Sequence, residues 1–137
     1  MKVYELFEKA SPNRTKNTAW VILHTGNKII LGKRSPITNN PNQWNFFGGH
    51  IDIGESAKEA AARELEEETG YKIDPSSLKQ LAEIGTATYF SAKITDASKV
   101  LPSSEISAVK NYKLTDLPDN LHSKTQTFFS NLDELLS

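Results

Sequence analysis

Short apolar runs separated by polar breaks characterise the first part of the chain. Residues 20–23 (Trp-Val-Ile-Leu) and 29–31 (Ile-Ile-Leu) lie on either side of the pair Gly26-Asn27. Two such runs around a Gly-Asn pair predict a β-hairpin. Residues 1–16 come before it with several polar residues and a proline, so we expect an arm or a short lead-in element there.

After the hairpin, the pattern predicts a loop followed by a short strand. Residues 35–43 contain two prolines and three asparagines, which favour a loop. Residues 44–47 are largely aromatic and predict a strand. We expect this strand to end at the glycine pair Gly48-Gly49.

The clearest helix is predicted for residues 57–69, because almost all of them are good helix formers. Ser56 and Glu59 have the spacing of a capping box at its start. Gly70 follows the helix, and glycine readily takes the left-handed conformation that ends many helices.

The second half of the chain predicts further strands and a final helix. Residues 81–94 and 106–114 hold the β-branched and aromatic residues typical of strands, and a polar stretch at 95–105 joins them. Apolar residues then recur at roughly helical spacing in a stripe formed by Leu121, Phe128, Phe129, Leu132, Leu135 and Leu136. Strands, helix, strands and helix in this order predict one mixed α/β domain over residues 1–137.

Composition excludes several kinds of protein. A chain of 137 residues can bury one core. Its 16 Lys and Arg against 17 Asp and Glu leave a net charge of −1, which gives no reason to expect duplex nucleic acid as a partner. The absence of cysteine excludes disulfides, thiolate zinc sites and a cysteine nucleophile. No apolar run is long enough to cross a bilayer and no apolar signal segment opens the chain, so we expect a cytoplasmic protein without a membrane partner.

Three glutamates share one face of the helix predicted for residues 57–69. At about 100° per residue, Glu68 lies about 40° and Glu67 about 60° from Glu64, on opposite sides of it. Like charges at these spacings repel by roughly 0.2–0.5 kcal/mol per pair on an exposed helix, and the helix dipole disfavours anions near the C-terminus. Arg63 and Lys72 are not expected to cancel this repulsion.

Small residues precede the acidic cluster on the same face of the helix: Ala57, Ala60 and Ala61. They allow the helix to approach a sheet closely, so we expect the cluster at the edge of a packed interface. A bound divalent cation would relieve the repulsion, because Mg²⁺ takes carboxylate oxygens as ligands. A solvated acidic helix is the alternative that charge alone leaves open.

The segment from Gly49 to Gly70 reads G-x5-E-x7-R-E-L-x-E-E-x-G, which resembles the Nudix box of the MutT-like hydrolase family. Its fixed positions match by chance in fewer than about one chain in a million. With Tyr71 the box spans residues 49–71, and the resemblance extends more loosely to 44–47. Tyr71 stands where an aliphatic residue is usual, and Phe47 where proline commonly precedes the glycines. These two departures leave the subfamily open.

The resemblance implies a Nudix-type α/β/α sandwich with a mixed β-sheet, in which the box forms a loop, a helix and a loop. It implies a hydrolase that uses Mg²⁺ or Mn²⁺ to cleave a diphosphate bond in a nucleoside diphosphate linked to another group. The implied metal ligands are the carboxylates of Glu64, Glu67 and Glu68 and the backbone carbonyl of Gly48. The resemblance also suggests that Glu55 and Arg63 brace the loop against the helix, with an ordinary surface salt bridge as the alternative.

Carboxylates beside such a metal can also take part in catalysis. A metal neutralises phosphate oxygens and lowers the pKa of a bound water, and a carboxylate within hydrogen-bond reach can take the proton. Glu64 and Glu67 are the candidates inside the box. Glu105 is the candidate outside it, because many family members carry a functional glutamate in a late loop or strand. A surface glutamate explains Glu105 equally well.

Substrate contacts are expected from the segments before the box. Lys33 and Arg34 follow the second hairpin strand, where a cation could reach a phosphate. Trp44 and Phe47 could stack on a base, although core packing is an equal alternative for such aromatic residues. The three histidines show no metal-ligand spacing and are expected to be structural or exposed.

The resemblance leaves a second class of function open, since some Nudix-like domains bind nucleotides without cleaving them. Such modules lose box glutamates, and none is lost here. Isopentenyl-diphosphate isomerase has a related fold, but its chemistry depends on cysteine, which this chain lacks. The short chain mildly favours a small nucleotide over a large polymer as substrate. The C-terminal helix could equally cap the core or join a homodimer.

Overall fold

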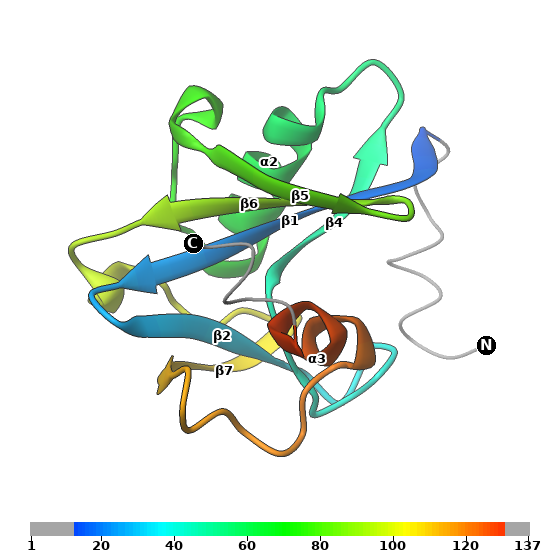
Figure 1. Ribbon diagram of the computed structural model, residues 1–137. Helices are drawn as coiled ribbons and strands as arrows, with labels where there is room; N and C mark the ends of the chain where they lie inside the picture. Colours follow the sequence, from blue (N-terminus) through cyan, green and yellow to red (C-terminus); the bar gives the residue numbers. More distant parts are fainter. Residues whose placement is uncertain (1–12, 131–137) are drawn as a thin grey trace.

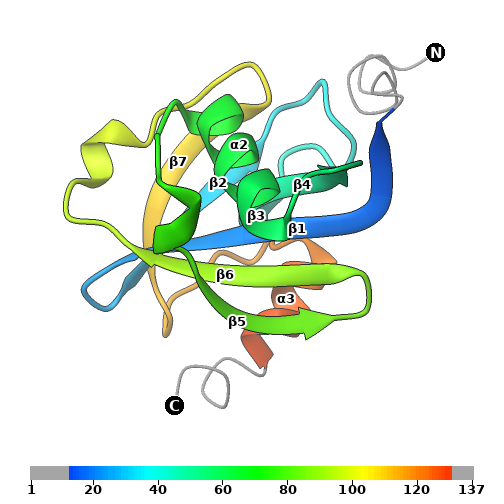
Figure 2. The same ribbon diagram turned by 90° about the horizontal axis from the view of Figure 1, so that it is seen from above.

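The computed structural model describes residues 13–130, in which a mixed seven-stranded sheet lies between helices α2 and α3 (Figure 1, Figure 2). Its strands are β1 (Arg14–Thr25), β2 (Lys28–Arg34), β3 (Trp44–Asn45), β4 (Phe47–Asp52), β5 (Lys79–Ile84), β6 (Ala87–Lys93) and β7 (Ile106–Lys113). Its helices are α2 (Ala57–Thr69) and α3 (Ser123–Ser130), with short 3₁₀ turns η1 (Pro75–Ser77) and η2 (Ala97–Lys99). No helix between residues 13 and 130 has the length and apolar character needed to cross a bilayer.

β1 organises the sheet because it is long enough to pair with two strands along one edge. Residues 23–25 pair with β2, and residues 14–21 pair with β4. The other edge of β1 pairs in parallel with β6, which carries β5. β3 and β7 pair with β2. The sheet therefore divides where β2 and β4 separate along β1.

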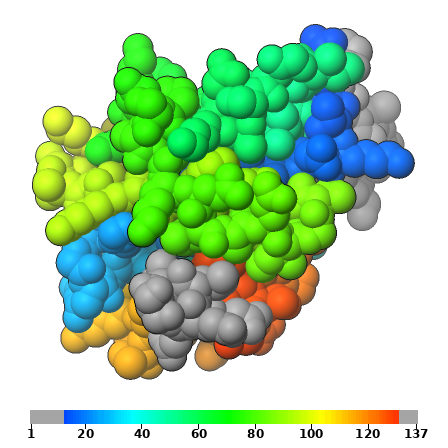
Figure 3. Space-filling view, turned by 45° about the horizontal axis from the view of Figure 1, so that its top comes forward, coloured from blue at the N-terminus to red at the C-terminus, as the bar shows by residue number. Residues whose placement is uncertain are grey.

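Alternate residues of β1 face the two sides of the sheet, as strand geometry requires. Ala19, Val21 and Leu23 belong to an apolar cluster that includes the buried residues of α2. Ile22 belongs to a second cluster, which includes Phe128 of α3. Seen towards β5, α2 lies above this edge strand and α3 below it (Figure 3). The predicted α/β/α sandwich is confirmed.

The first hairpin and the box helix form as predicted. β1 and β2 are antiparallel and joined by Gly26-Asn27. Ser56 Oγ accepts a hydrogen bond from the Glu59 N–H at 3.1 Å, and Glu59 Oε1 accepts one from the Ser56 N–H at 3.0 Å. Gly70 ends α2 with a φ of 75°. The local sequence therefore determines both ends of this helix.

Two boundaries in the first half of the chain differ from the prediction. β1 begins at Arg14, so the arm predicted for residues 1–16 extends too far, and residues 1–12 lie outside the described part. The strand predicted for 44–47 is two strands, of which β4 runs through both glycines. The glycines do not end the strand, because both of them pair with β1. The loop at 35–43 is confirmed.

The strand predicted for residues 81–94 is a hairpin of β5 and β6. Its turn contains Gly85, with a φ of 60°. The sequence does not show this turn, because strand-like residues lie on both sides of it. The final helix is confirmed as α3, in which Phe128 is fully buried. Leu121 precedes α3, and the rest of the predicted stripe at Leu132, Leu135 and Leu136 lies outside the described residues.

Candidate active site

A cleft of about 540 Å³ lies at the divided edge of the sheet. One side, which we name the acidic wall, consists of Glu64, Glu67, Glu68 and Glu105. The side that we name the second wall consists of Thr18, Trp20, Asn45, His122 and Lys124. The acidic wall comes from α2 and the segment before β7, whereas the second wall comes from β1, β3 and the start of α3.

The carboxylates of α2 are unevenly buried. Glu68 is 4% exposed, and its Oε1 accepts a hydrogen bond from the Gly48 N–H at 2.8 Å. The side chain of Glu64 is 18% exposed and that of Glu67 is 58% exposed. The predicted position at the edge of a packed interface is therefore confirmed for Glu64 and Glu68. It is wrong for Glu67, which extends into solvent.

The paired glycines allow α2 to lie close to the sheet. A Cβ atom on Gly49 would lie 2.7 Å from the carboxyl carbon of Glu64. A Cβ atom on Gly48 would lie 2.2 Å from the carbonyl oxygen of Ala19. Both distances are too short for non-bonded atoms, so a side chain at either position would displace its neighbour. The buried alanines of α2 make the same close approach, as predicted.

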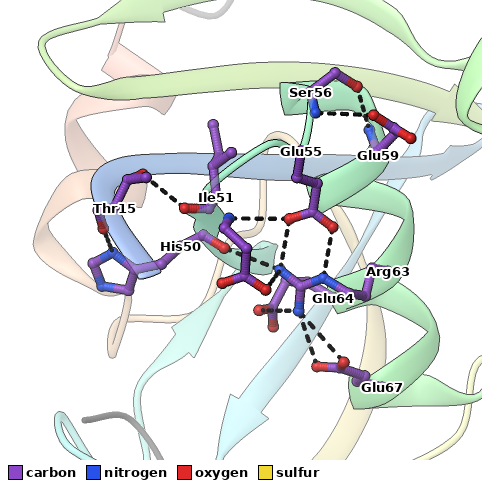
Figure 4. A network of polar contacts seen from close by, with 10 residues as sticks. Thr15, His50, Ile51, Glu55, Ser56, Glu59, Arg63, Glu64 and Glu67 are labelled. Carbon is purple, nitrogen blue, oxygen red and sulfur yellow. Dashed lines mark hydrogen bonds and ion pairs between the residues drawn. The ribbon is translucent and has the colours of Figure 1, made fainter. Parts of the chain in front are cut away.

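Arg63 is the centre of a polar network (Figure 4). Its Nε and Nη2 donate to the two carboxylate oxygens of Glu55 at 2.8 and 3.0 Å, and Nη2 also donates to the His50 carbonyl at 3.1 Å. Its Nη1 donates to Glu64 Oε1 at 3.0 Å and to Glu67 Oε2 at 3.3 Å. Arg63 stands directly before Glu64 and one helical turn before Glu67, and so contacts both carboxylates. The expectation that it would not cancel the acidic repulsion still holds at Glu64, because the pKa of Glu64 stays raised against the effect of Arg63.

Glu55 connects this network to the loop between β4 and α2. Its Oε1 also accepts a hydrogen bond from the Asp52 N–H at 3.1 Å. The hydrogen bond from Arg63 lowers the pKa of Glu55, against the opposing effect of partial burial. Arg63 thus joins the helix to the loop through Glu55, as the resemblance suggested, and through an ion pair with Asp52 at 3.6 Å.

Burial is the main cause of the raised pKa values of Glu64 and Glu68. Burial, together with Glu67 and Glu105 and against Arg63, raises the pKa of Glu64 to about 7. Burial also raises the pKa of Glu68 well above its ordinary value, and Glu64 and Glu105 add to this shift. A positive charge among these oxygens would offset both the repulsion and the lost hydration.

The second wall is aromatic and neutral to basic. The indole N–H of Trp20 donates to Thr18 Oγ1 at 2.9 Å. His122 Nδ1 accepts a hydrogen bond from the backbone N–H of Lys124 at 3.2 Å. Burial lowers the pKa of His122, and Arg34 and Lys124 lower it further. This histidine therefore favours its neutral form beside two cations.

The sequence matches the family model of the NUDIX domain over residues 14–132. The chain belongs to the Nudix family. It is 46% identical to an RNA pyrophosphohydrolase of Pelagibacter ubique over 52 residues, which are 38% of this chain and 32% of that protein. It is 44% identical to an m7GpppN-mRNA hydrolase of Xenopus laevis over 55 residues, which are 39% of this chain and 19% of that protein. The matched parts thus span about a third or less of these curated relatives.

Solved Nudix structures share the fold. The chain is similar to the MutT protein of Methanosarcina mazei with a TM-score of 0.71 and 23% identity, over 88% of this chain and 96% of that one. It is similar to an Ap4A hydrolase of C. elegans with a TM-score of 0.66 and 22% identity, over 88% and 98% of the two chains. At these identities the likeness establishes the sandwich architecture.

The Nudix-box glutamates have the chemistry for a hard cation but are held by protein groups here. Within residues 13–130, no three His, Asp or Glu side chains are grouped closely enough to hold one ion. Arg63 contacts Glu64 and Glu67, while the Gly48 N–H holds Glu68. The donor set still fits Mg²⁺ or Mn²⁺, because these ions prefer oxygen ligands and carboxylates above all.

Most residues that the sequence assigned to the site line the cleft: Arg34, Gly48, Arg63, Glu64, Glu67, Glu68 and Glu105. Glu55 does not line the cleft, but it accepts a hydrogen bond from Arg63, which does. Lys33 does not line the cleft. Of these two neighbours at the end of β2, only Arg34 therefore faces the cleft.

The two aromatic residues assigned to the substrate belong to the core. Phe47 is fully buried in the cluster beneath α2. Trp44 is 9% exposed and packs edge-on against Tyr112, with ring centroids 5.2 Å apart. Neither ring lines the cleft, so the stacking role is withdrawn for both. Trp20, which the sequence pattern placed in an apolar run, lines the cleft instead.

Sequence reasoning missed one face of β1. Arg14, Lys16, Thr18 and Trp20 alternate along this strand, and all four line the cleft. These four residues stand at every second position, as one face of a strand requires. The predicted arm at residues 1–16 separates Arg14 and Lys16 from the predicted strand at 20–23, so the sequence does not show them as one face. Further lining residues carry no local signal: Asn39, Asn40, Asn45, His50, His122 and Lys124.

Proposed function

We propose that this cleft hydrolyses a diphosphate bond in a nucleoside diphosphate linked to another group, with Mg²⁺ or Mn²⁺ as cofactor. The observation that carries the proposal is the buried Glu68 beside Glu64 and Glu105. Burying like charges together is unfavourable unless an opposite charge is bound among them. The cleft of about 540 Å³ also has the size of ligand sites, which is roughly 300–1,000 Å³.

The groups proposed to hold the metal are Glu64, Glu67, Glu68 and the carbonyl of Gly48. When bound, the metal neutralises phosphate oxygens, orients the linkage and lowers the pKa of a coordinated water. Arg63 contacts Glu64 and Glu67 together, and so keeps these two carboxylates on one face of α2. The Gly48 N–H fixes one oxygen of Glu68 in the same way.

The groups proposed to take the proton from the attacking water are Glu64, Glu67 and Glu105. Glu105 comes from the segment before β7, yet it raises the pKa of both Glu64 and Glu68. Its carboxylate therefore lies near the box glutamates. Because a general base must reach the water directly, this proximity supports Glu105 as the candidate outside the box.

Two further residues have proposed roles in binding and positioning. Arg63 grips Glu55 through two parallel hydrogen bonds, which holds the loop against α2. Arg34 lines the cleft, and its charge lowers the pKa of Glu68, so it lies near enough to the acidic wall to bind a phosphate. Within this arrangement Glu55 and Arg63 position the box, and Arg34 contacts the substrate.

The substrate is proposed to be of the nucleotide type. Similar proteins bear the names RNA pyrophosphohydrolase, m7GpppN-mRNA hydrolase and Ap4A hydrolase, which all denote nucleotide-type substrates. The size of the cleft supports a small nucleotide rather than a long polymer. We further propose that residues 1–137 act as a single Nudix domain.

A nucleotide panel tests this function. The purified chain is incubated with nucleoside triphosphates and dinucleoside polyphosphates in Mg²⁺, Mn²⁺ or EDTA, and products are identified by phosphorus NMR. We expect cleavage at a phosphoanhydride bond in the presence of metal and none in EDTA. A non-catalytic binding module would bind the same nucleotides without releasing product, and that result would overturn the proposal.

A further inference from the structure

Asn45 of β3 presents an amide of fixed orientation to the cleft. The residue is 6% exposed and lines the cleft. Its Oδ1 accepts a hydrogen bond from the Phe46 N–H at 2.8 Å and another from the hydroxyl of Thr125 on α3. A backbone N–H can only donate, so the atom that it meets must be the carbonyl oxygen of the amide. The orientation of the side chain follows from this contact.

The amide nitrogen of Asn45 is consequently directed away from both partners. Within the part of the chain that the structure describes, Nδ2 donates no hydrogen bond. Among these described residues, Ser35 Oγ is the one side-chain polar atom that is fully buried and has no hydrogen-bond partner. Because Nδ2 also has no partner and is not such an atom, it is accessible to solvent. Asn45 therefore offers a neutral donor to a ligand in the cleft.

Trp20 supplies a flat apolar surface on the same wall. It is partly buried against the cluster that contains Phe46, the neighbour of Asn45. The hydrogen bond from its indole N–H to Thr18 Oγ1 restricts the ring. A held aromatic ring and a neutral donor suit a nucleobase, because bases stack on rings and present acceptor atoms at their edges. A phosphate would be bound better by the charge of Arg34.

The hydroxyl of Thr125 has a partner on a strand of the sheet. Thr125 is 1% exposed, and its hydroxyl donates to the amide of Asn45. Thr127 and Ser130 are exposed and donate to backbone carbonyls of the helix itself. α3 thus lines the cleft with Lys124 and also holds Asn45 of the cleft through Thr125.

We infer that Asn45 recognises a hydrogen-bond acceptor on the nucleobase of the substrate, and that Thr125 is a positioning residue that holds its amide. The inference rests on the proposed function, since it names the group that determines which nucleotide is preferred. It assigns base recognition to the second wall and leaves the reaction to the acidic wall.

The variants Asn45→Asp and Thr125→Val test the inference. Aspartate still accepts from Phe46 and Thr125 but has no N–H to donate, whereas valine keeps the packing of Thr125 without its hydroxyl. We measure kcat and KM for ATP, GTP, CTP and UTP with Mg²⁺, and the Kd of each nucleotide by calorimetry. The quantity compared is the ratio of kcat/KM between the best and the worst of the four nucleotides.

We expect Asn45→Asp to reduce this ratio by about tenfold through KM, the scale of one hydrogen bond, with kcat nearly unchanged. Thr125→Val is expected to reduce this ratio by about threefold, because it removes only the hydroxyl that positions the amide of Asn45. Thr125→Ser keeps a hydroxyl and is expected to retain the wild-type ratio. Thr127→Val makes the same chemical change on the exposed side of α3 and should leave the ratio unaltered.

Failure of the inference differs from failure of the proposed function. A wild-type protein without base preference, or an unchanged ratio in Asn45→Asp, would overturn base recognition while hydrolysis stands. An equal loss for all four nucleotides would likewise contradict it, since it would indicate charge or folding rather than recognition. Base-selective binding without turnover would instead uphold base recognition and overturn hydrolysis.

Discussion

The two walls of the cleft differ in how their residues are distributed along the chain. Three of the four acidic-wall carboxylates come from one helix, with its capping residues and the glycines of β4 close by in sequence. The second wall combines residues from β1, β3 and the start of α3. The groups proposed for the reaction are therefore local in sequence, whereas those proposed for substrate recognition are brought together by the sheet.

The walls also differ in charge and burial. Glu64 and Glu68 are largely buried with raised pKa values, and the proposed metal would compensate their charge. Trp20 and Asn45 are neutral and already hold hydrogen bonds to their own neighbours. This difference teaches that the proposed metal would complete one wall, while the protein itself already holds the side chains of the other in place. Four substitutions or conditions test the comparison.

The largest effect is expected from Glu68→Gln. Glutamine keeps the acceptor for the Gly48 N–H but removes a charge from the acidic wall, so turnover should fall by roughly a factor of 10³. Glu66→Gln, at an exposed position of the same helix, should leave turnover unchanged. Steady-state kinetics at saturating metal measure both, with circular dichroism to verify folding. Equal turnover in the two variants would refute the role of the acidic wall.

Gly49→Ala should lower turnover by about a hundredfold, the scale of misplacing a catalytic group by an ångström. The new Cβ would lie 2.7 Å from the carboxyl carbon of Glu64 and must displace it. The measurement is kcat together with the melting temperature, since displacement of one carboxylate should affect rate far more than stability. Wild-type kcat would show that Glu64 can move without consequence.

Arg34→Ala and Lys33→Ala form a matched pair beside the second wall. Arg34 lines the cleft and Lys33 does not, so the first change should raise KM about tenfold and the second should have no effect. Comparison of KM for the same nucleotide distinguishes them. If both changes raised KM equally, the cause would be the general charge of the surface rather than a contact in the cleft.

The smallest expected effect is the stabilisation of the wild-type fold by Mg²⁺ alone. A ligand at about ten times its Kd adds about 1.4 kcal/mol to the free energy of unfolding, so the melting temperature should rise by several degrees. Glu68→Gln should lose this increase, because it removes one of the proposed ligands. Differential scanning calorimetry with Mg²⁺, and with Na⁺ at equal ionic strength, gives the comparison. An identical rise in the variant would exclude Glu68 from the metal site.

The sequence predicted the acidic wall better than the second wall, for a physical reason. Capping, helix propensity and carboxylate spacing act within one or two helical turns, so Ser56, Glu64 and Glu68 could be placed from their neighbours. Trp44 was misplaced because an aromatic residue suits a core and a binding surface equally, and only its packing against Tyr112 decides between them.

The sequence by itself determined the box helix, the first hairpin, the α/β class and the acidic face of α2. Tertiary structure alone decided that one face of β1 lines the cleft and that Asn45 meets Thr125. These contacts depend on strand pairing and on packing between residues up to 80 positions apart. Local patterns carry no information about such partners, because their free energy is gained only when the sheet and both helices have assembled.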